Sequence, residues 1–103
     1  MEKSKGETFV GFAMRAKKCK TGANACNTLK RANAVIVCKT ASENTVADAK
    51  KLAKKFNCPL IKTVKKPLAE IVFKENVKVA AITDRALSTA LKDNLGEDFI
   101  EIV

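Results

Sequence analysis

The hydrophobic positions of the chain predict an alternation of helices and short strands. Apolar residues recur at helical spacing from Glu7 to Lys18, and a second helix is expected from Ala23 to about Ala32, after the loop Lys20–Gly22. The apolar run Asn33–Cys38 is short, continuous and bounded by polar residues. A run of this kind is typical of a strand that is buried on both faces.

The second half of the chain repeats this alternation, and its helices carry start and stop signals. Ser42 is a good N-cap for an amphipathic helix, while Asp84 can cap the last helix and Gly96 can end it. The expected elements are a helix over Glu43–Phe56, a strand that starts with Cys58–Ile61, a basic loop Lys62–Lys66, a helix from Pro67 to about Lys74, a strand over Val77–Ile82, the helix that follows Asp84, and a strand over Phe99–Val103.

This order of elements defines the expected fold class. Strands that alternate with helices form a mainly parallel or mixed sheet with helices on both faces. The chain is therefore expected to be an α/β protein, a three-layer α/β/α sandwich with a four-stranded mixed sheet. Its 103 residues have the length of one domain, residues 1–103.

The charge of the chain is strongly positive and unevenly distributed. Lys and Arg number 20 against 11 Asp and Glu, which gives a formal net charge of +9. Up to Lys66 the net charge is +12, and from Pro67 onward it is −3. An excess of this size points to a polyanionic partner, usually a nucleic acid. Its contacts are expected mainly in the first two-thirds of the chain.

Several residue types that common catalysis needs are absent. The chain has no His, which excludes His-based acid–base catalysis and His-ligated zinc. It also has neither a GxGxxG nor a P-loop motif, and its four cysteines form no CxxC pair. We therefore expect no metal, no cofactor and no small-molecule substrate, and a protein that is not an enzyme.

The cysteines and the amino-terminal segment bear on chemistry and compartment. Cys38 lies in an apolar run and is expected in the core. Cys19 lies between lysines, which could lower its pKa, so a thiol-dependent enzyme or redox sensor stands beside the reading of an ordinary thiol. Met1–Glu7 is too charged for a secretory signal, and no apolar stretch approaches the roughly 20 residues of a membrane span. A cytoplasmic protein with free thiols and no membrane contact is expected.

Two basic segments are the candidate contacts with a polyanion. The first leads into Gly22 and the start of the second helix, where free backbone N–H groups can bind phosphate and Asn24 can read a base edge. The second is the loop Lys62–Pro67, in which Val64 could lie against an extruded base. The alternatives are a helix-start Asn24 without a partner, and a solvated surface for this loop and for the lysines of the third helix. The candidate RNA-binding residues are Arg15, Lys17, Lys18, Lys20, Gly22, Asn24, Lys30, Arg31, Val64 and Lys65.

Four segments between Val10 and Leu95, taken together, resemble a known family. They are Val10–Ala16 (VGFAMRA), Arg31–Thr45 (RANAVIVCKTASENT), Asn57–Leu60 (NCPL) and Val77–Leu87 (VKVAAITDRAL). The segments are similar, in the same order, to the kink-turn RNA-binding ribosomal protein superfamily of the L-seven-Ae and L-thirty-e type. Within that superfamily they most resemble the small bacterial YlxQ-type branch.

The resemblance implies an α/β/α sandwich with a four-stranded mixed sheet and binding to kink-turn RNA. In the family, a G-x-N-E-x-x-K motif at the start of the second helix contacts the sheared G·A pairs, and Gly22 and Asn24 match it. Ala25 and Thr28 stand where the motif has Glu and Lys. Each lost bidentate base contact costs about 1–3 kcal/mol of discrimination, whereas backbone affinity from Lys and Arg can persist.

These observations lead to one main hypothesis and one alternative. The main hypothesis is a monomeric, non-enzymatic, ribosomal-protein-like domain that binds structured, kink-turn-like RNA through the start of its second helix and a basic loop. The alternative is a protein-interaction module of the same fold that has lost specific kink-turn recognition. The residues Ala25 and Thr28 motivate the alternative, because they remove two side chains that read the RNA.

Overall fold

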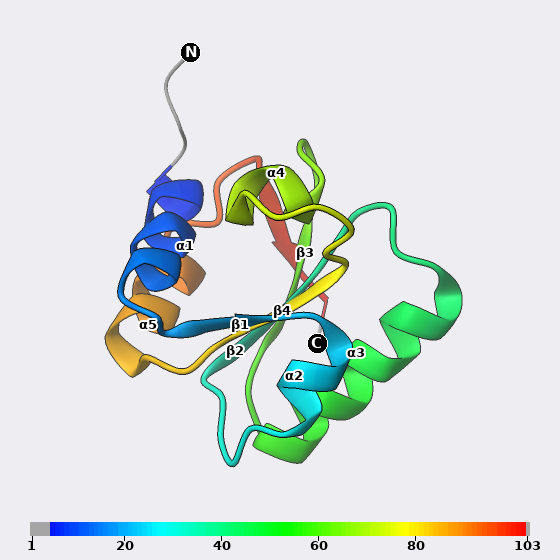
Figure 1. Cartoon of the computed structure of the whole chain (residues 1–103). Coiled ribbons are helices and arrows are strands. Elements are labelled where there is room, and N and C mark those ends of the chain that lie inside the picture. Colours follow the sequence, from blue (N-terminus) through cyan, green and yellow to red (C-terminus); the bar gives the residue numbers. More distant parts are fainter. Residues whose placement is uncertain (1–4, 103) are drawn as a thin grey trace.

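The computed structural model describes residues 5–102, in which helices and strands alternate along the chain (Figure 1). The expected α/β class is therefore confirmed. Met1–Ser4 and Val103, which belong to the charged amino-terminal segment and the expected final strand, lie outside the described residues. The elements are α1 (Lys5–Arg15), β1 (Cys19–Thr21), α2 (Ala23–Asn27), β2 (Ala34–Val37), α3 (Glu43–Phe56), β3 (Leu60–Thr63), α4 (Leu68–Val72), β4 (Val79–Ile82), α5 (Arg85–Asp93) and β5 (Phe99–Glu101).

The strands of the described residues form one five-stranded mixed sheet in the order β1-β4-β2-β3-β5. Only β2 and β3 run parallel, and every other neighbouring pair is antiparallel. The mixed sheet agrees with the sequence, but the expected number of four strands is wrong. The extra strand is β1, whose first residue Cys19 pairs with Ile82 of β4. Three residues are too few to show a strand period, so Lys20–Gly22 was expected to be a loop.

Helices cover both faces of the sheet. Consecutive residues of a strand point to opposite faces, so the apolar central strands present a hydrophobic surface on each side. In β2, Ala34 and Ile36 belong to one buried cluster, and Val35 and Val37 belong to the other. Figure 1 shows α1, α4 and α5 on one side of the sheet and α2 and α3 on the other. Every residue of β2 is buried, as its continuous apolar run predicted.

Two of the three expected helix signals are used as predicted. The Thr45 N–H donates to the Ser42 hydroxyl at 3.2 Å at the start of α3. At the start of α5, the Leu87 N–H donates to an Asp84 carboxylate oxygen at 2.9 Å. The third signal is wrong, since α5 ends at Asp93 rather than at Gly96.

Several boundaries differ from the sequence prediction for local reasons. Helix α1 ends at Arg15 rather than Lys18, because Lys17 has a left-handed backbone with φ of 59°. Left-handed Phe73, with φ of 57°, likewise ends α4 early. Strand β3 continues to Thr63, so the expected basic loop Lys62–Lys66 begins only at Val64.

Candidate nucleic-acid interface

The strand directions decide which candidate residues share an end of the sheet. Thr21 pairs with Ala80, and Val37 pairs with both Val79 and Lys62. The carboxyl ends of β1, β2 and β3 and the amino end of β4 therefore meet at one end, which we call the Gly22 end. The opposite end, where β2 and β3 begin, is called the Asn33 end.

Gly22 lies between β1 and α2 in a conformation that favours glycine. Its φ is +92°, its N–H donates to the Val79 carbonyl at 2.8 Å, and its own carbonyl accepts from the Cys26 N–H at 3.0 Å. Asn24 is exposed in the first turn of α2. An exposed amide side chain therefore lies in the first turn after Gly22.

Helix α2 is much shorter than expected. It ends at Asn27 instead of about Ala32, and the Thr28 hydroxyl donates to the Ala25 carbonyl at 2.8 Å just after the last turn. A helix of five residues has a small dipole, because the dipole sums over aligned peptide units. An anion at this segment would be held by individual N–H groups and neighbouring lysines rather than by a helix dipole.

The second candidate segment, Val64 and Lys65, also lies at the Gly22 end. Val64 is 45% exposed, and its N–H donates to the Asp98 carbonyl at 2.8 Å, which fixes the loop against the segment before β5. Since β1 and β3 are separated by β4 and β2, the two candidate segments lie three strand spacings apart, about 14 Å. The fold thus brings two distant parts of the sequence to one end of the molecule.

The lysines of the second segment already contact carboxylates. Lys65 Nζ lies 3.0 Å from a Glu97 carboxylate oxygen, and Lys66 Nζ lies 3.1 Å from Glu7. The hydrogen bond and the charge of Glu97 raise the pKa of Lys65. Both side chains of the Lys65–Glu97 pair are exposed, and a solvent-exposed ion pair contributes little to stability. A phosphate can therefore replace Glu97 at low cost.

Sequence reasoning missed two lysines between the candidate segments. Lys39 follows β2, and its Nζ donates to the Lys65 carbonyl at 3.3 Å. Lys78 precedes β4, and its Nζ donates to the Thr40 hydroxyl at 2.7 Å. The sequence places each lysine directly beside a strand, but only the strand order β1-β4-β2-β3 locates them between Gly22 and Val64.

A hollow opens beside β3 and the first turns of α3. Its volume is about 330 Å³, and it is lined by Ala41, Glu43, Val46, Ala47, Lys50 and Lys62. Lys62 was expected in a loop, but it lies in β3 at the rim of this hollow. The hollow offers apolar walls, two lysine cations and one carboxylate, that of Glu43, near the Gly22 end.

The other candidate residues do not join the Gly22 end. The Lys18 carbonyl accepts from the Thr83 N–H at 2.7 Å, which places Lys18 at the Asn33 end. Lys30 and Arg31 are exposed in the loop before β2 and lie at the same end. The Arg15 guanidinium lies 5.0 Å from the centre of the Phe12 ring on α1. Lys18, Lys30 and Arg31 therefore lie at the opposite end of the sheet from Gly22 and Asn24.

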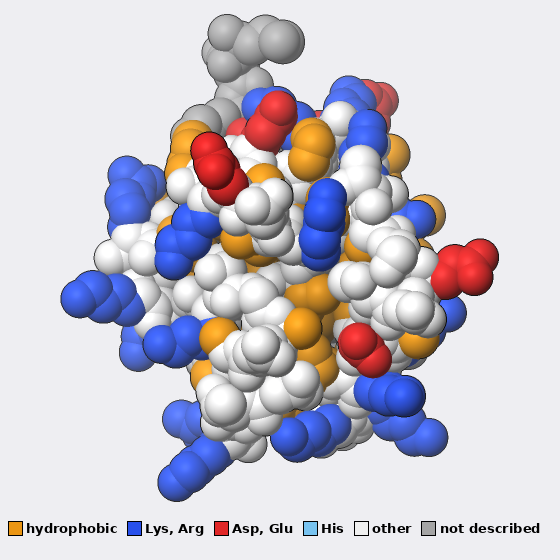
Figure 2. Space-filling model, turned by 45° about the vertical axis from the view of Figure 1, so that its right-hand side comes forward, with side chains coloured by type: hydrophobic (Ala, Val, Ile, Leu, Met, Phe, Trp, Pro, Cys, Tyr) orange, Lys and Arg blue, Asp and Glu red, His pale blue; other side chains and the backbone are white. Residues whose placement is uncertain are grey.

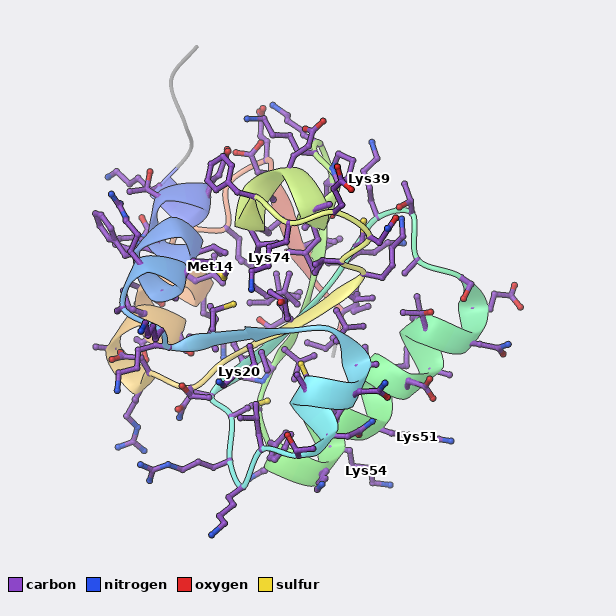
Figure 3. All side chains as sticks on the ribbon, viewed as in Figure 1. Met14, Lys20, Lys39, Lys51, Lys54 and Lys74 are labelled. Carbon is purple, nitrogen blue, oxygen red and sulfur yellow. The ribbon has the colours of Figure 1, made fainter. Side chains whose placement is uncertain are left out.

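Lys17 and Lys20 lie along the outer edge of β1. With Met14, Cys19, Thr21, Ala25 and Lys74 they line a hollow of about 310 Å³. Figure 3 shows Lys74 above β1 and Lys20 below it, whereas Lys51 and Lys54 extend from α3 into solvent. Figure 2 shows Lys and Arg side chains around a mostly uncharged centre.

Burial, rather than neighbouring lysines, dominates the chemistry of Cys19. Its side chain is 8% exposed, and burial, with a smaller contribution from Cys26, raises the pKa of Cys19 to about 12 although Lys74 lowers it. The raised pKa argues against the reactive-thiol alternative and agrees with an ordinary, unreactive thiol. Cys38 lies in the core as predicted, where burial raises its pKa but hydrogen bonds from Thr40 and Leu68 lower it overall.

A membrane-spanning helix and a metal-binding cluster are both absent from the described residues. Among residues 5–102, no helix is long and apolar enough to cross a membrane. No group of three or more His, Cys, Asp or Glu side chains within the same residues could hold a metal ion.

These features define a mixed α/β protein with a five-stranded sheet and basic loops at both ends. The chain is similar in fold to the solved structure of a protein of unknown function from Bacillus halodurans C. The TM-score is 0.74 with 20% sequence identity, over 88% of this chain and 96% of that chain. At this identity the likeness shows the fold alone. No family model and no curated protein matches the chain.

Proposed function

We propose that this protein is a non-enzymatic domain that binds structured RNA, with kink-turn-like RNA as the expected ligand. The observation that carries the proposal is the meeting of Gly22 and Asn24 with Val64 and Lys65 at one end of the sheet. The resemblance in sequence assigns RNA contact to these two segments, and they are about 40 positions apart in the chain. The helices on both faces fit the three-layer α/β/α sandwich that the same resemblance implies.

The Gly22 end offers contacts for the RNA backbone. The N–H groups of the first turn of α2 and the ammonium groups of Lys39, Lys65 and Lys78 are phosphate donors. Lysine contacts of this kind release counterions, so the affinity depends on salt. Asn24 is the one candidate side chain here that carries both a donor and an acceptor for a base edge.

The hollow beside β3 supports the binding of an extruded base. Apolar walls from Ala41, Val46 and Ala47 suit the face of a base, and Lys62 and Lys50 at the rim suit its phosphate. Exposed Val64 lies in the loop that directly follows β3. An RNA that turns sharply at the Gly22 end would present such a base.

The expected specificity is lower than that of the complete family motif. Ala25 and the Thr28 side chain, whose hydroxyl bonds the Ala25 carbonyl, stand at the positions of the motif Glu and Lys. Neither residue supplies the charged contact that the motif would make. The protein is therefore expected to recognise shape and charge more strongly than base identity.

A binding titration tests the proposal. Binding of a fluorescent kink-turn RNA and of a plain RNA duplex should be measured from low to high salt, with Asn24→Ala, with Lys39→Gln plus Lys78→Gln, and with Lys54→Gln plus Lys51→Gln as the charge-matched control. We expect the Lys39/Lys78 variant to reduce the slope of log K against log salt by about 2, one unit for each lost phosphate contact.

The outcomes separate the proposed interface from general attraction to a basic protein. Asn24→Ala should weaken the kink-turn complex by about 1–3 kcal/mol and leave duplex binding unchanged. The Lys51/Lys54 control on α3 should leave both kink-turn binding and duplex binding unchanged. Equal losses of RNA affinity in the Lys39/Lys78 variant and in the control would overturn the Gly22 end as the RNA site. An affinity that does not change with salt concentration would do the same.

Exposed apolar side chains favour the second candidate, a protein-interaction module. Phe73 is 71% exposed and lies beside a hollow of about 240 Å³ that Ala69, Glu70, Lys74 and Glu75 also line. Purification of the native complex distinguishes the two candidates. Protein partners that survive nuclease treatment and are lost in Phe73→Ser, without any bound RNA, would replace the RNA proposal. The cytoplasmic, monomeric state remains part of the main proposal.

A further inference from the structure

Helix α5 presents a polar stripe on the face that looks toward the Asn33 end. Ser88, Thr89 and Lys92 follow Arg85 by three, four and seven residues, which places the four side chains on one side of the helix. Leu91, on the adjoining inner face of α5, is fully buried in the core. The stripe therefore has a fixed position relative to the sheet.

The stripe forms one wall of a hollow of about 200 Å³. The other wall consists of Asn33, which precedes β2, and Pro59, which precedes β3. No carboxylate lines this hollow. The nearest recorded carboxylate contact of its lysine is a long one of 4.0 Å between Lys92 Nζ and Glu101. Two cations thus face a polar hollow whose described lining contains no counter-charge.

The Asp84 carboxylate, although adjacent in the chain to Arg85, does not neutralise the two cations of this hollow. Its carboxylate caps the helix by accepting from the Leu87 N–H at 2.9 Å, and its backbone carbonyl accepts from the Ser88 N–H at 3.0 Å. Arg85, which directly follows the cap, forms no recorded ion pair in residues 5–102 and is exposed. Its guanidinium is therefore available to a ligand.

Ser88 supplies a second, independent sign of a missing partner. The residue is 4% exposed, and its hydroxyl oxygen is buried without a hydrogen-bond partner in the described structure. Buried hydroxyl groups are nearly always paired, because an unpaired one loses its water without compensation. Ser88 lines the same hollow as Arg85 and Lys92, so a rotation about its χ1 would let the hydroxyl donate to a ligand oxygen there.

We propose that Arg85, Ser88, Thr89, Lys92 and Asn33 form a binding site for a phosphoryl group. A guanidinium can donate two parallel hydrogen bonds to a phosphate, an ammonium adds a point charge, and two hydroxyl groups and an amide can donate to the remaining oxygens. This number of donors suits a tetrahedral phosphate, which presents three terminal oxygens as a monoester and two non-bridging oxygens in a nucleic-acid backbone. The site lies at the opposite end of the sheet from Gly22, so it does not depend on the proposed function.

The phosphoryl group has two possible sources with the same chemistry. One is a free phosphate or a small phosphate monoester. The other is an RNA strand, since Lys18, Lys30 and Arg31 lie at the same end and could continue its path. A protein with phosphate contacts at both ends would bind two segments of one RNA.

The first experiment titrates inorganic phosphate into the full chain at constant ionic strength, with chloride as the balancing anion. Amide NMR signals report the position of binding. We expect saturable shifts at Asn33, Arg85 and Thr89, a rise of about tenfold in the apparent Kd for Arg85→Gln, and a rise of about fivefold for Ser88→Ala. Lys54→Gln, which removes one exposed charge from α3, should leave the Kd unchanged.

Thermal unfolding separates a ligand contact from a structural role of Ser88. Without phosphate, Ser88→Ala should keep or raise the melting temperature, because it removes an unpaired buried hydroxyl. With phosphate, the increase in melting temperature seen in the wild type should shrink in the variant. Shifts that do not saturate, or a Kd that stays the same in both Arg85→Gln and Ser88→Ala, would overturn the site.

A third measurement distinguishes the two sources. A short RNA is compared with and without a 5′-phosphate, on the wild type and on Arg85→Gln. If the Arg85 effect requires the terminal phosphate, the site takes a phosphate monoester. If the effect is equal for both RNAs, the site takes the RNA backbone. If Arg85→Gln changes neither RNA binding nor phosphate binding, the proposal is wrong.

Discussion

Gly22 shows how a single residue connects the fold with the proposed interface. It directly follows β1, and its N–H donates to the Val79 carbonyl of β4. Its own carbonyl accepts from the Cys26 N–H in α2. No heavy atom lies within 4 Å of a Cβ placed at this position. A side chain would therefore meet no clash, and the whole cost of a substitution would come from the backbone φ of +92°.

Gly22→Ala should lower the free energy of unfolding by about 1–2 kcal/mol, because an L-residue is strained in this conformation. Gly11→Ala is the matched control, since Gly11 lies within α1 and a Cβ there also has open space. The control should raise stability by up to about 1 kcal/mol. Urea unfolding measures both, and a similar change in the two variants would contradict the assignment.

The buried thiols predict how stability depends on pH. Burial raises the pKa of Cys26 and Cys58 from 9.0 to about 11. Unfolded thiols ionise first as the pH rises, so these groups stabilise the fold fully below about pH 9 and progressively less up to about pH 11. Urea unfolding at pH 8 and pH 10.5 should show a smaller alkaline loss in Cys58→Ala than in the wild type. An equal loss would argue against this cause.

At the scale of elements, the sequence predicted those whose signals are local. The helix over Glu43–Phe56 was predicted with the bounds it has, since its cap and its apolar face are both complete within the segment. Strand β1 was missed because its three residues become a strand only by pairing with Val79–Ile82, about 60 positions later. The length of α2 was overestimated because the helix closes after Asn27 through hydrogen bonds from Thr28 and Leu29, which the apolar spacing does not indicate.

The cap of α3 gives a test at this scale. Ser42→Ala removes the acceptor of the Thr45 N–H and should lower the free energy of unfolding by about 1 kcal/mol. Ser42→Asp should restore stability, because Asp also caps and its charge suits the start of a helix. Chemical unfolding of the three proteins at pH 7 measures the series. If Ser42→Asp is as unstable as Ser42→Ala, the cap does not act in this way.

At the scale of the whole molecule, the sequence located the positive charge but not its arrangement. The segments around Gly22 and Val64 were identified from composition and resemblance, and the parallel and antiparallel pairings bring them to one end. The same pairings carry Lys18, Lys30 and Arg31 to the other end. Neither outcome can be deduced from spacing along the chain, because strand order depends on contacts between distant segments.

The net charge of +9 predicts opposite effects of salt on folding and on RNA binding. Screening weakens the repulsion among lysines, so the melting temperature should rise as KCl increases from about 0.01 to 0.3 M. Over the same range, the affinity for RNA should fall. Differential scanning calorimetry and the binding titration measure the two effects. A melting temperature that falls with KCl would contradict self-repulsion as a destabilising factor.

The central position of β4 has a consequence for folding during synthesis. This strand lies between β1 and β2, although it follows both of them in the chain. A nascent chain that has not yet exposed Ile82 outside the ribosome has no neighbour for β1 in the sheet, and its Gly22 N–H lacks the Val79 carbonyl. The helices can form early from local contacts, but the Gly22 end can be completed only when four-fifths of the chain has emerged.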